Sequence, residues 1–299
     1  MIDEHALYSR LNRLLTLIEA ESEDISAANE ILKAIQKNED AISLFLSHYS
    51  LYANDRKINY PAFLEDVQKI SKLIGIEKQK SFFPLIVLLL ERSEGVYIDS
   101  GFSHEKWIEN LCDLCWKIRE CKNWLGFTGI YSDTWYERWL FANAVTFHRL
   151  QFEIICSPLE YKSENFDINV GDTLINIHIP SNYRLPFNRE NIEKSFDLAR
   201  EYYRKKLNIK PIFHCSSWLI FNEHKNILPK ESNIRIFTEM FEMGYCDYNK
   251  NFPHCSRIFN VLKPLQDPTE YEEKTSLQRA YKKFLIEGGI PGWQRGYRY

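Results

Sequence analysis

The hydrophobic pattern of this 299-residue chain changes its period near Phe147, and this change constrains the fold more than any other feature. Up to that point, apolar residues recur every three or four positions, which is the spacing of a buried helix face. RLQFEI (149–154) and TLINIHI (173–179) instead alternate apolar and polar residues, as a half-buried strand does. The pattern predicts a helical domain over residues 1–147 and a domain with a sheet over residues 148–299. The first helical stripe comprises Leu7, Leu11, Leu14, Leu15 and Ile18.

Further stripes in the first half predict a helical bundle and the ends of some of its helices. Gly75 follows one stripe and can adopt the left-handed conformation that ends a helix, whereas Ser103 precedes another and can cap its first turn. The run Phe82–Leu90 holds nine mostly apolar residues, far fewer than the ~20 that cross a bilayer. We therefore expect a buried helix there and no membrane span. The two stripes are Phe63, Val67, Ile70 and Ile74, and Trp107, Leu111, Leu114 and Ile118.

The second half reads as a strand, a helix and another strand in succession. The helix begins after Asn188, a residue type that caps helices, and the next strand is predicted in PIFHCSSWLIF (211–221). Such a crossover favours parallel pairing, and the predicted class is α/β (α+β): an N-terminal helical bundle, then a mixed sheet flanked by helices. Farther on, residues 232–241 are ambiguous between helix and extended chain, residues 255–262 predict a strand, and residues 277–285 predict a final helix. The apolar face of the first of these helices comprises Ile192, Phe196, Ala199 and Tyr203.

Charge and cysteine usage argue against several classes of protein. The 38 Lys and Arg residues and 41 Asp and Glu residues give a formal net charge of -3, so no broad basic surface is expected and nucleic acid is not an expected partner. Seven cysteines at irregular spacing, behind an N-terminus without signal-peptide features, indicate reduced thiols in a cytoplasm. Cys112 and Cys115 form a C-x-x-C, but no second pair stands at zinc-finger spacing, so no metal site is predicted. Neither of the usual glycine-rich nucleotide motifs occurs.

Four short motifs occur in a fixed order along the second half: HIPS (178–181), SWL (217–219), LPKESNI (228–234) and TSLQRA (275–280). Together with the segment GIYSDTWYERWLFANAVTFHRLQFEI, this ordered set resembles a bacterial-type family of acyltransferases with an N-terminal helical domain and a GNAT-like C-terminal domain. The resemblance covers about residues 125–290, whereas the first 120 residues match only in helical character and length.

The resemblance implies an N-acyltransferase that moves an acyl group from a thioester, usually of coenzyme A, to an amine of a small molecule or a peptide. In such enzymes the thioester lies in a V-shaped opening between two splayed strands, a backbone amide polarises its carbonyl, and the amine attacks directly. Here the strands would be residues 173–180 and 211–221, with the opening just past Pro180. Main-chain N–H groups near Ile179 and Ser181 would then supply the oxyanion donors. Direct attack implies no covalent enzyme intermediate, so no cysteine should be essential.

The chain departs from the family pattern after HIPS and in the second strand. Asn182, Tyr183 and Arg184 stand where relatives carry glycines, and Ser216 stands where relatives often carry His. Arg184 and the helix N-terminus near Asn188 remain candidates to hold an anion, either the pyrophosphate of coenzyme A or the phosphopantetheine of a carrier protein. These departures leave a second function open, that of a non-catalytic GNAT-like binding or regulatory protein.

Three polar residues are candidates for the catalytic steps. Glu153 would accept the amine proton directly or through water, and His178 would shuttle a proton, since an unperturbed imidazole titrates at about pH 6.5. Ser217 would protonate the leaving sulfur or bind the pantetheine, and the adjacent Trp218 is a candidate contact for the donor. Each catalytic candidate has a structural alternative: an ion-paired surface Glu, a hydrogen-bonded packing His, and a small Ser that lets strands pack closely.

Overall fold

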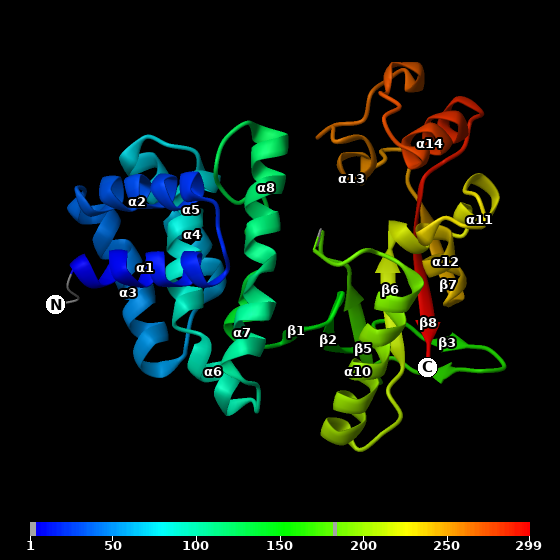
Figure 1. Ribbon diagram of the computed structural model, residues 1–299, viewed down its shortest axis with the longest axis horizontal. Helices are drawn as coiled ribbons and strands as arrows, with labels where there is room; N and C mark the ends of the chain where they lie inside the picture. The colour runs from blue at the N-terminus through cyan, green and yellow to red at the C-terminus, as the bar shows by residue number, and fades with distance from the viewer. Residues whose placement is uncertain (1–3, 182–183) are drawn as a thin grey trace. The chain divides into compact units, whose positions relative to one another are not determined.

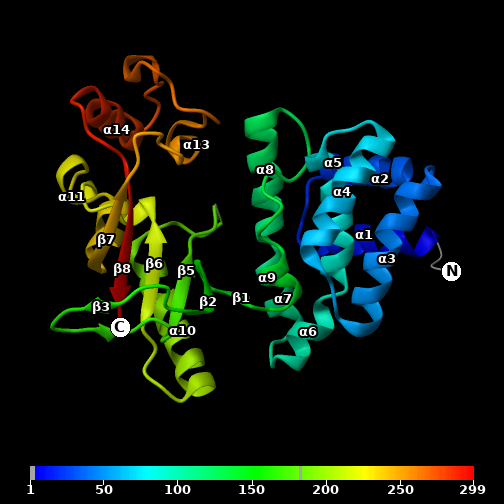
Figure 2. The same ribbon diagram turned by 180° about the vertical axis from the view of Figure 1, so that it is seen from behind.

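The computed structural model describes residues 4–181 and 184–299, and the chain forms two compact units (Figures 1 and 2). They are Met1–Val145 and Thr146–Tyr299, so the division falls two residues before the predicted one.

The regular structure of the N-terminal unit is helical up to the start of β1 (Ala144–Phe147). Its central helix is α5 (Lys78–Glu91), in which every residue from Ser81 onward is buried. The helices α1 to α4 all pack against α5, so the buried helix predicted from its apolar run is the centre of the bundle. The other helices are α1 (Glu4–Leu17), α2 (Ser22–Gln36), α3 (Glu39–Asp55), α4 (Tyr60–Ile74), α6 (Glu94–Asp99), α7 (His104–Leu111), α8 (Asp113–Leu125) and α9 (Glu137–Leu140).

The predicted helix ends agree with the structure, but one predicted helix is in fact two. Gly75 ends α4 in the left-handed conformation with φ 71°, and the Ser103 side chain accepts a hydrogen bond from the Lys106 N–H at the start of α7. The stripe that begins at Trp107 was expected to continue through Ile118. Instead the helix is interrupted at Cys112, whose carbonyl accepts the Cys115 N–H in a tighter turn.

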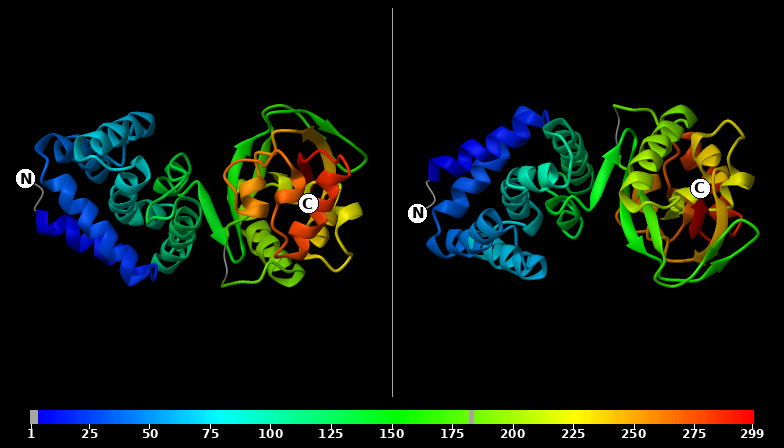
Figure 3. Two further views of the ribbon diagram at one scale, coloured as in Figure 1. Left: turned by 90° about the horizontal axis from the view of Figure 1, so that it is seen from above. Right: turned by 90° about the horizontal axis from the view of Figure 1, so that it is seen from below.

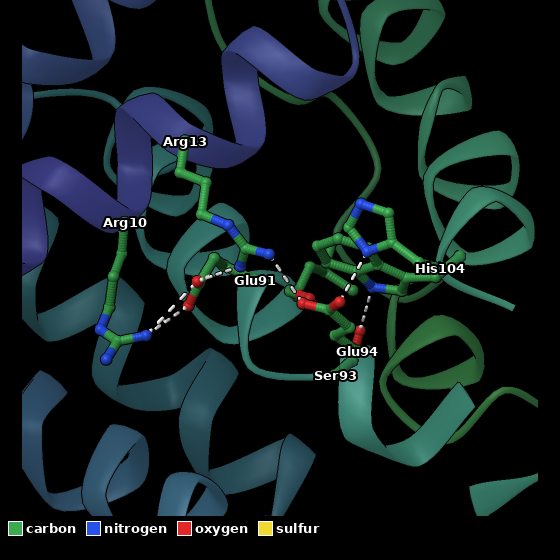
Figure 4. Close-up of polar contacts among 8 residues, drawn as sticks. Arg10, Arg13, Glu91, Ser93, Glu94 and His104 are labelled. Atoms are coloured by element: carbon green, nitrogen blue, oxygen red, sulfur yellow. Dashed lines mark hydrogen bonds and ion pairs between the residues drawn. The ribbon is translucent and has the colours of Figure 1, made fainter. Parts of the chain in front are cut away.

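Charged side chains fasten α1 to the C-terminal end of α5 (Figure 4). The carboxylate of Glu91 is 2% exposed and lies 3.1 Å from Arg10 Nη1 and 2.8 Å from Arg13 Nη1. Arg13 also pairs with Glu94 at 2.8 Å, and Glu94 in turn lies 2.6 Å from His104 Nδ1. Burial opposes the ionisation of Glu94, but hydrogen bonds from Arg13 and His104 outweigh it and lower the pKa of that carboxyl. The ion pairs therefore connect four helices, α1, α5, α6 and α7.

A six-stranded sheet in the order β1-β2-β5-β6-β8-β7 forms the centre of the C-terminal unit. The neighbours β5 and β6 run parallel because α10 crosses between them, while β2–β5, β6–β8 and β8–β7 are antiparallel. The strands are β1 (Ala144–Phe147), β2 (Leu150–Cys156), β5 (Thr173–His178), β6 (Phe213–Ser217), β7 (Glu242–Tyr248) and β8 (Gly292–Arg298). The longest helices of the C-terminal unit are α10 (Arg189–Leu207) and α14 (Ser276–Ile286).

The two faces of the sheet are covered by different elements (Figure 3). Phe196 of α10 packs edge-on against Phe152 of β2 and Phe213 of β6, which makes this face apolar. A two-stranded hairpin of β3 (Tyr161–Lys162) and β4 (Asp167–Ile168) lies over the other face, where Tyr161 stacks on Tyr297 at 4.3 Å. Polar side chains of β2, β5 and β6 occupy the rest of this second face.

Two predicted strands differ from the structure. Of residues 211–221, only β6 is extended, and the chain then turns into a short 3₁₀ helix η1 (Trp218–Ile220). Residues 255–262, expected as a strand, contain the helix α13 (Cys255–Phe259), which Asn260 ends in the left-handed conformation. Cys255, Ile258 and Phe259 belong to one aromatic-rich core cluster, and this shared burial at helical spacing overrides the extended tendency of the segment. The ambiguous segment contains α12 (Asn233–Glu239).

The contact between α1 and α5 leads to a prediction about stability. Replacing Glu91 by Gln keeps the shape of the side chain but removes the charge that Arg10 and Arg13 share. We expect the free energy of unfolding to fall by about 1–2 kcal/mol, because both guanidinium groups are partly exposed and regain water. Urea denaturation measures this change. Glu65→Gln on the exposed side of α4 is the matched control and should cost less than ~0.5 kcal/mol; equal losses would contradict the structural role of Glu91.

Candidate active site

The parallel strands β5 and β6 separate before either of them ends. Asn176 opposite His214 is the last pair in the register of the two strands. Nevertheless β5 continues to His178 and β6 continues to Ser217. The strands therefore diverge from Asn176 onward rather than past Pro180, where the sequence predicts the opening.

The edge of β5 that faces β6 carries main-chain N–H groups into this opening. The N–H of Ile175 points toward β6 and donates to the Ile212 carbonyl at 2.9 Å. Because N–H groups alternate along an extended strand, the N–H of Ile179 continues on the same side, past the last pair. Pro180 favours extended backbone at Ile179 and has no N–H of its own. Ser181, the second predicted donor, follows in the connection to α10.

A histidine and a glutamate meet on the polar face of the sheet. The register of β2 and β5 places Gln151 opposite His178 and Glu153 opposite Asn176, so these side chains share one face. His178 Nε2 lies 2.9 Å from Glu153 Oε2, and the two side chains are 21% and 14% exposed. An imidazole that donates from one nitrogen to a carboxylate holds its lone pair on the other nitrogen. We call this pair the Glu153–His178 dyad; its geometry suits a general base.

Two residues that the sequence did not single out extend the dyad across the sheet. Asn176 Nδ2 lies 3.2 Å from His178 Nε2, and Asn176 Oδ1 lies 2.9 Å from His214 Nδ1. Burial, followed by the charge of Arg295 and the nearby His178, lowers the pKa of His214 to about 4. His214 is therefore neutral at pH 7. The alternation in TLINIHI placed Asn176 on the polar face, but nothing in the sequence indicated its partner.

A buried arginine holds the connection between β5 and α10. Arg149 is 5% exposed, and its Nη1 donates to the Pro180 carbonyl at 2.7 Å. Its guanidinium also lies over the ring of Phe187, 5.3 Å from the centroid. The N–H of Arg149 donates to Ser195 Oγ of α10 at 2.9 Å. One residue thus fixes the end of β5 and the first turns of α10.

The N-terminus of α10 begins where the sequence predicts it. Asn188 Oδ1 accepts the Asn191 N–H at 3.0 Å, which caps a helix of 19 residues. The N–H groups and dipole of such a terminus favour an anion, and Arg184 is exposed four positions before the cap. Asn182 and Tyr183, which replace the glycines of the family, lie outside the described residues.

The end of β6 directs its two serines to opposite faces. Ser216 lies on the face of the dyad and accepts a hydrogen bond from Trp293 Nε1 at 2.8 Å. Ser217 lies on the other face, is buried, and accepts the Leu219 N–H at 3.1 Å as the cap of η1. Trp218 is 9% exposed and packs in the aromatic-rich cluster around α13. Ser217 therefore has a structural role, and its catalytic role, like the donor contact of Trp218, stays a prediction.

A buried histidine near the end of β6 was also missed by the sequence. His254 stacks on Trp218 with an interplanar angle of 9° and contacts Phe252 and Trp293 edge-on. It is 3% exposed, and neither ring nitrogen has a hydrogen-bond partner within the described ranges. Burial lowers the pKa of His254 to about 4, since a charged imidazole would lose its water here.

Within residues 4–181 and 184–299, no group of three or more His, Cys, Asp or Glu side chains has an arrangement that holds a metal ion. In the same ranges no helix combines the length and apolar character that crossing a membrane requires. All seven cysteines carry free thiols, including Cys112 and Cys115 of the C-x-x-C.

Comparisons with known proteins place these features in a family. The model of a family described as GNAT-like C-terminal domain matches residues 145–298. No curated protein sequence matches the chain. An acyltransferase solved in complex with decanoyl-CoA and teicoplanin is similar with a TM-score of 0.71 and 15% identity, over 96% of this chain and 86% of that chain. A single-residue mutant of an acyltransferase in complex with octanoyl-CoA gives 0.72 and 14%, over 97% and 87%. The predicted fold class, a helical bundle followed by a GNAT-like mixed sheet, is confirmed.

The buried His254 leads to a prediction about pH. Its pKa rises from about 4 in the fold to 6.5 when unfolded, so the unfolded chain binds more protons between these values. The stabilising contribution of neutral His254 is complete above pH 6.5 and is lost as pH falls toward 4. We expect His254→Phe to flatten this decline by up to roughly 1 kcal/mol per pH unit in urea unfolding. Phe252→Leu, next to it, should shift stability equally at every pH; parallel curves for His254→Phe would contradict the prediction.

Proposed function

Because the family model covers its C-terminal half, the chain belongs to the family of proteins with a GNAT-like C-terminal domain, and we propose that it is an acyltransferase. It moves an acyl group from a thioester, that of coenzyme A, to an amine of a small molecule or a peptide. The observation that carries this proposal is the early separation of β5 and β6 beside the Glu153–His178 dyad.

The opening between β5 and β6 suits the donor. A thioester laid against the free edge of β5 brings its carbonyl oxygen to the N–H of Ile179, which stabilises the oxyanion. The phosphates of coenzyme A then reach the N-terminus of α10 and Arg184, where helix dipole and charge favour them. Related structures that hold decanoyl-CoA or coenzyme A support this choice of donor, and a carrier-protein thioester is the variant that offers the same phosphopantetheine.

The dyad supplies the proton transfer. The amine nitrogen attacks the thioester carbon, and its proton moves to His178 Nδ1 while Nε2–H donates to Glu153. The new C–N bond forms, the C–S bond breaks, and the thiolate leaves and takes up a proton. The Ser217 hydroxyl is the proposed donor to that sulfur; a proton from solvent replaces the one it gives up, and His178 returns the amine proton to solvent. Because the amine attacks directly, no cysteine carries the acyl group at any step.

The acceptor approaches from the face on which the dyad is partly exposed. A related structure holds a glycopeptide, teicoplanin, together with decanoyl-CoA, which supports an amine on a small molecule or a peptide as the acceptor class. Trp293 and Arg295, both on this face of β8, offer an aromatic ring and a cation beside Ser216.

The dyad is tested by measuring thiol release from acyl-CoAs in the presence of a panel of amines. We expect His178→Ala to lower kcat/KM by about 10²- to 10⁴-fold, because the amine proton loses its acceptor, and Glu153→Gln to lower it by about 10-fold or more. Cys156→Ser, at the exposed end of the same strand β2, is the control and should keep full activity without an acylated cysteine in mass spectra. Full activity in His178→Ala would refute this role.

Donor binding is tested separately by calorimetry with coenzyme A and acyl-CoAs of two to ten carbons. We expect micromolar affinity that weakens in salt, and about tenfold weaker binding in Arg184→Glu, because this change removes a cation near the α10 N-terminus. Arg204→Glu makes the same charge change at the C-terminal end of α10 and should leave affinity unchanged. Millimolar or no binding by the unaltered chain would favour a non-catalytic binding or regulatory protein instead.

A further inference from the structure

The amide of Asn176 bridges two imidazoles at the point where β5 and β6 separate. Its nitrogen is 3.2 Å from His178 Nε2, and its oxygen is 2.9 Å from His214 Nδ1. His178 Nε2 is also 2.9 Å from Glu153 Oε2. The orientation of the Asn176 amide and the positions of the ring protons of His178 and His214 therefore decide which atom donates in each of the three contacts.

Counting donors and acceptors selects one arrangement. An ionised Glu153 requires the proton of His178 on Nε2, and that N–H would then face the amide N–H of Asn176, donor against donor. Turning the amide by half a rotation exchanges its oxygen and nitrogen within the same space. Nε2–H then donates to Glu153 and to the amide oxygen, while the amide N–H donates to Nδ1 of His214. Each of these three contacts now joins a donor to an acceptor, and the proton of His214 lies on its buried Nε2, which has no hydrogen-bond partner in the described part of the chain.

We propose that Asn176 and His214 are positioning residues that hold His178 in the tautomer with its proton on Nε2 and its lone pair on Nδ1. The catalytic meaning of that tautomer rests on the proposed function, because Nδ1 is the nitrogen that takes the proton of the amine. The opposite orientation of the amide would donate to Nε2 and stabilise the tautomer that cannot accept this proton.

His214 suits this role because it stays neutral. Its 4% exposure, the charge of Arg295 on β8 and the neighbouring His178 all oppose a proton on it, and its pKa falls to about 4. A neutral ring with its proton on Nε2 accepts the amide N–H at Nδ1, whereas a doubly protonated ring would donate at Nδ1 and favour the opposite orientation of the amide. The titratable or charged side chains around His214 and the dyad are Glu153, His178, Tyr297 and Arg295.

The experiment reads the tautomer directly from ¹⁵N chemical shifts of histidine in the full-length protein. We expect the unaltered chain to show a protonated Nε2 and an unprotonated Nδ1 at His178, assigned by its loss in His178→Gln. Asn176→Leu, which keeps the branching but not the hydrogen bonds, should give a mixture of tautomers. A single unchanged tautomer in Asn176→Leu would show that Glu153 suffices and would overturn the proposal.

His214 variants give an independent comparison. His214→Gln keeps an acceptor oxygen for the amide N–H and should retain the tautomer, whereas His214→Phe should lose it. Tyr297→Phe is the control, because its ring lies 5.4 Å from the His214 ring and the change removes only a hydroxyl. We expect kcat/KM to fall about tenfold in Asn176→Leu and His214→Phe with an unchanged KM for the acyl-CoA, and to recover in His214→Gln. Equal losses in His214→Gln and His214→Phe would contradict a positioning role.

A second signature comes from Asn176→Asp, which adds a carboxylate beside His178. The added charge favours the imidazolium, so the acidic limb of the pH profile of kcat/KM should move to higher pH; an unmoved limb would count against the contact. Failure of the two proposals can be told apart, because the tautomer is measured without substrate. If the protein shows no transferase activity but its tautomers respond to the substitutions as expected, only the proposed function is contradicted. If Nδ1 of His178 carries the proton in the unaltered chain, the positioning proposal is contradicted.

Discussion

The separation of β5 and β6 depends on the partners that each strand keeps on its outer side. β5 stays paired with β2 as far as His178, and β6 stays paired with β8 as far as Ser217. Unpaired backbone groups are costly when they are buried, so two strands can diverge only where their facing edges meet water or a ligand. The outer pairs keep both edges straight, and Arg149 fixes the carbonyl of Pro180 where β5 ends. The edge of β5 that faces β6 thus exposes main-chain N–H groups, and no side chain is needed to supply these donors.

One face of the sheet contributes mainly to stability, and the other carries the polar side chains of the candidate active site. On one face, the phenylalanines of β2, β6 and α10 make the apolar contact that holds the strands in place. On the other face, the period of two brings Glu153, Asn176, His178 and His214 together from three strands. Because the same strands carry both faces, the dyad and the opening are held at a fixed distance from each other.

The sequence predicted those parts of the unit that depend on local pattern. The face of TLINIHI that bears His178, the Asn188 cap and the parallel crossover all follow from periodicity and capping. The strand β8 was missed because Gly292 and Gly296 interrupt its pattern, and both are needed where Phe221 and Phe241 pack closely on the backbone. The partnership of Asn176 with His214 was missed as well, because the register of two strands distant in sequence decides it. Such pairings are tertiary and leave no mark in either segment.

The composition of the polar face also bears on the choice between an enzyme and a binding protein of the same shape. A sheet face that served only packing would be at least as stable with apolar side chains, since polar groups that lose water cost free energy unless each finds a partner. Here three hydrogen bonds join a carboxylate, an amide and two imidazoles. They lie beside the stretch in which the described parts of β5 and β6 run unpaired. A partner that merely occupied the opening would need the main-chain edge but not these four side chains. Their alignment with the edge is what a reaction at that edge requires, because a base is useful only within reach of the atom from which it removes a proton.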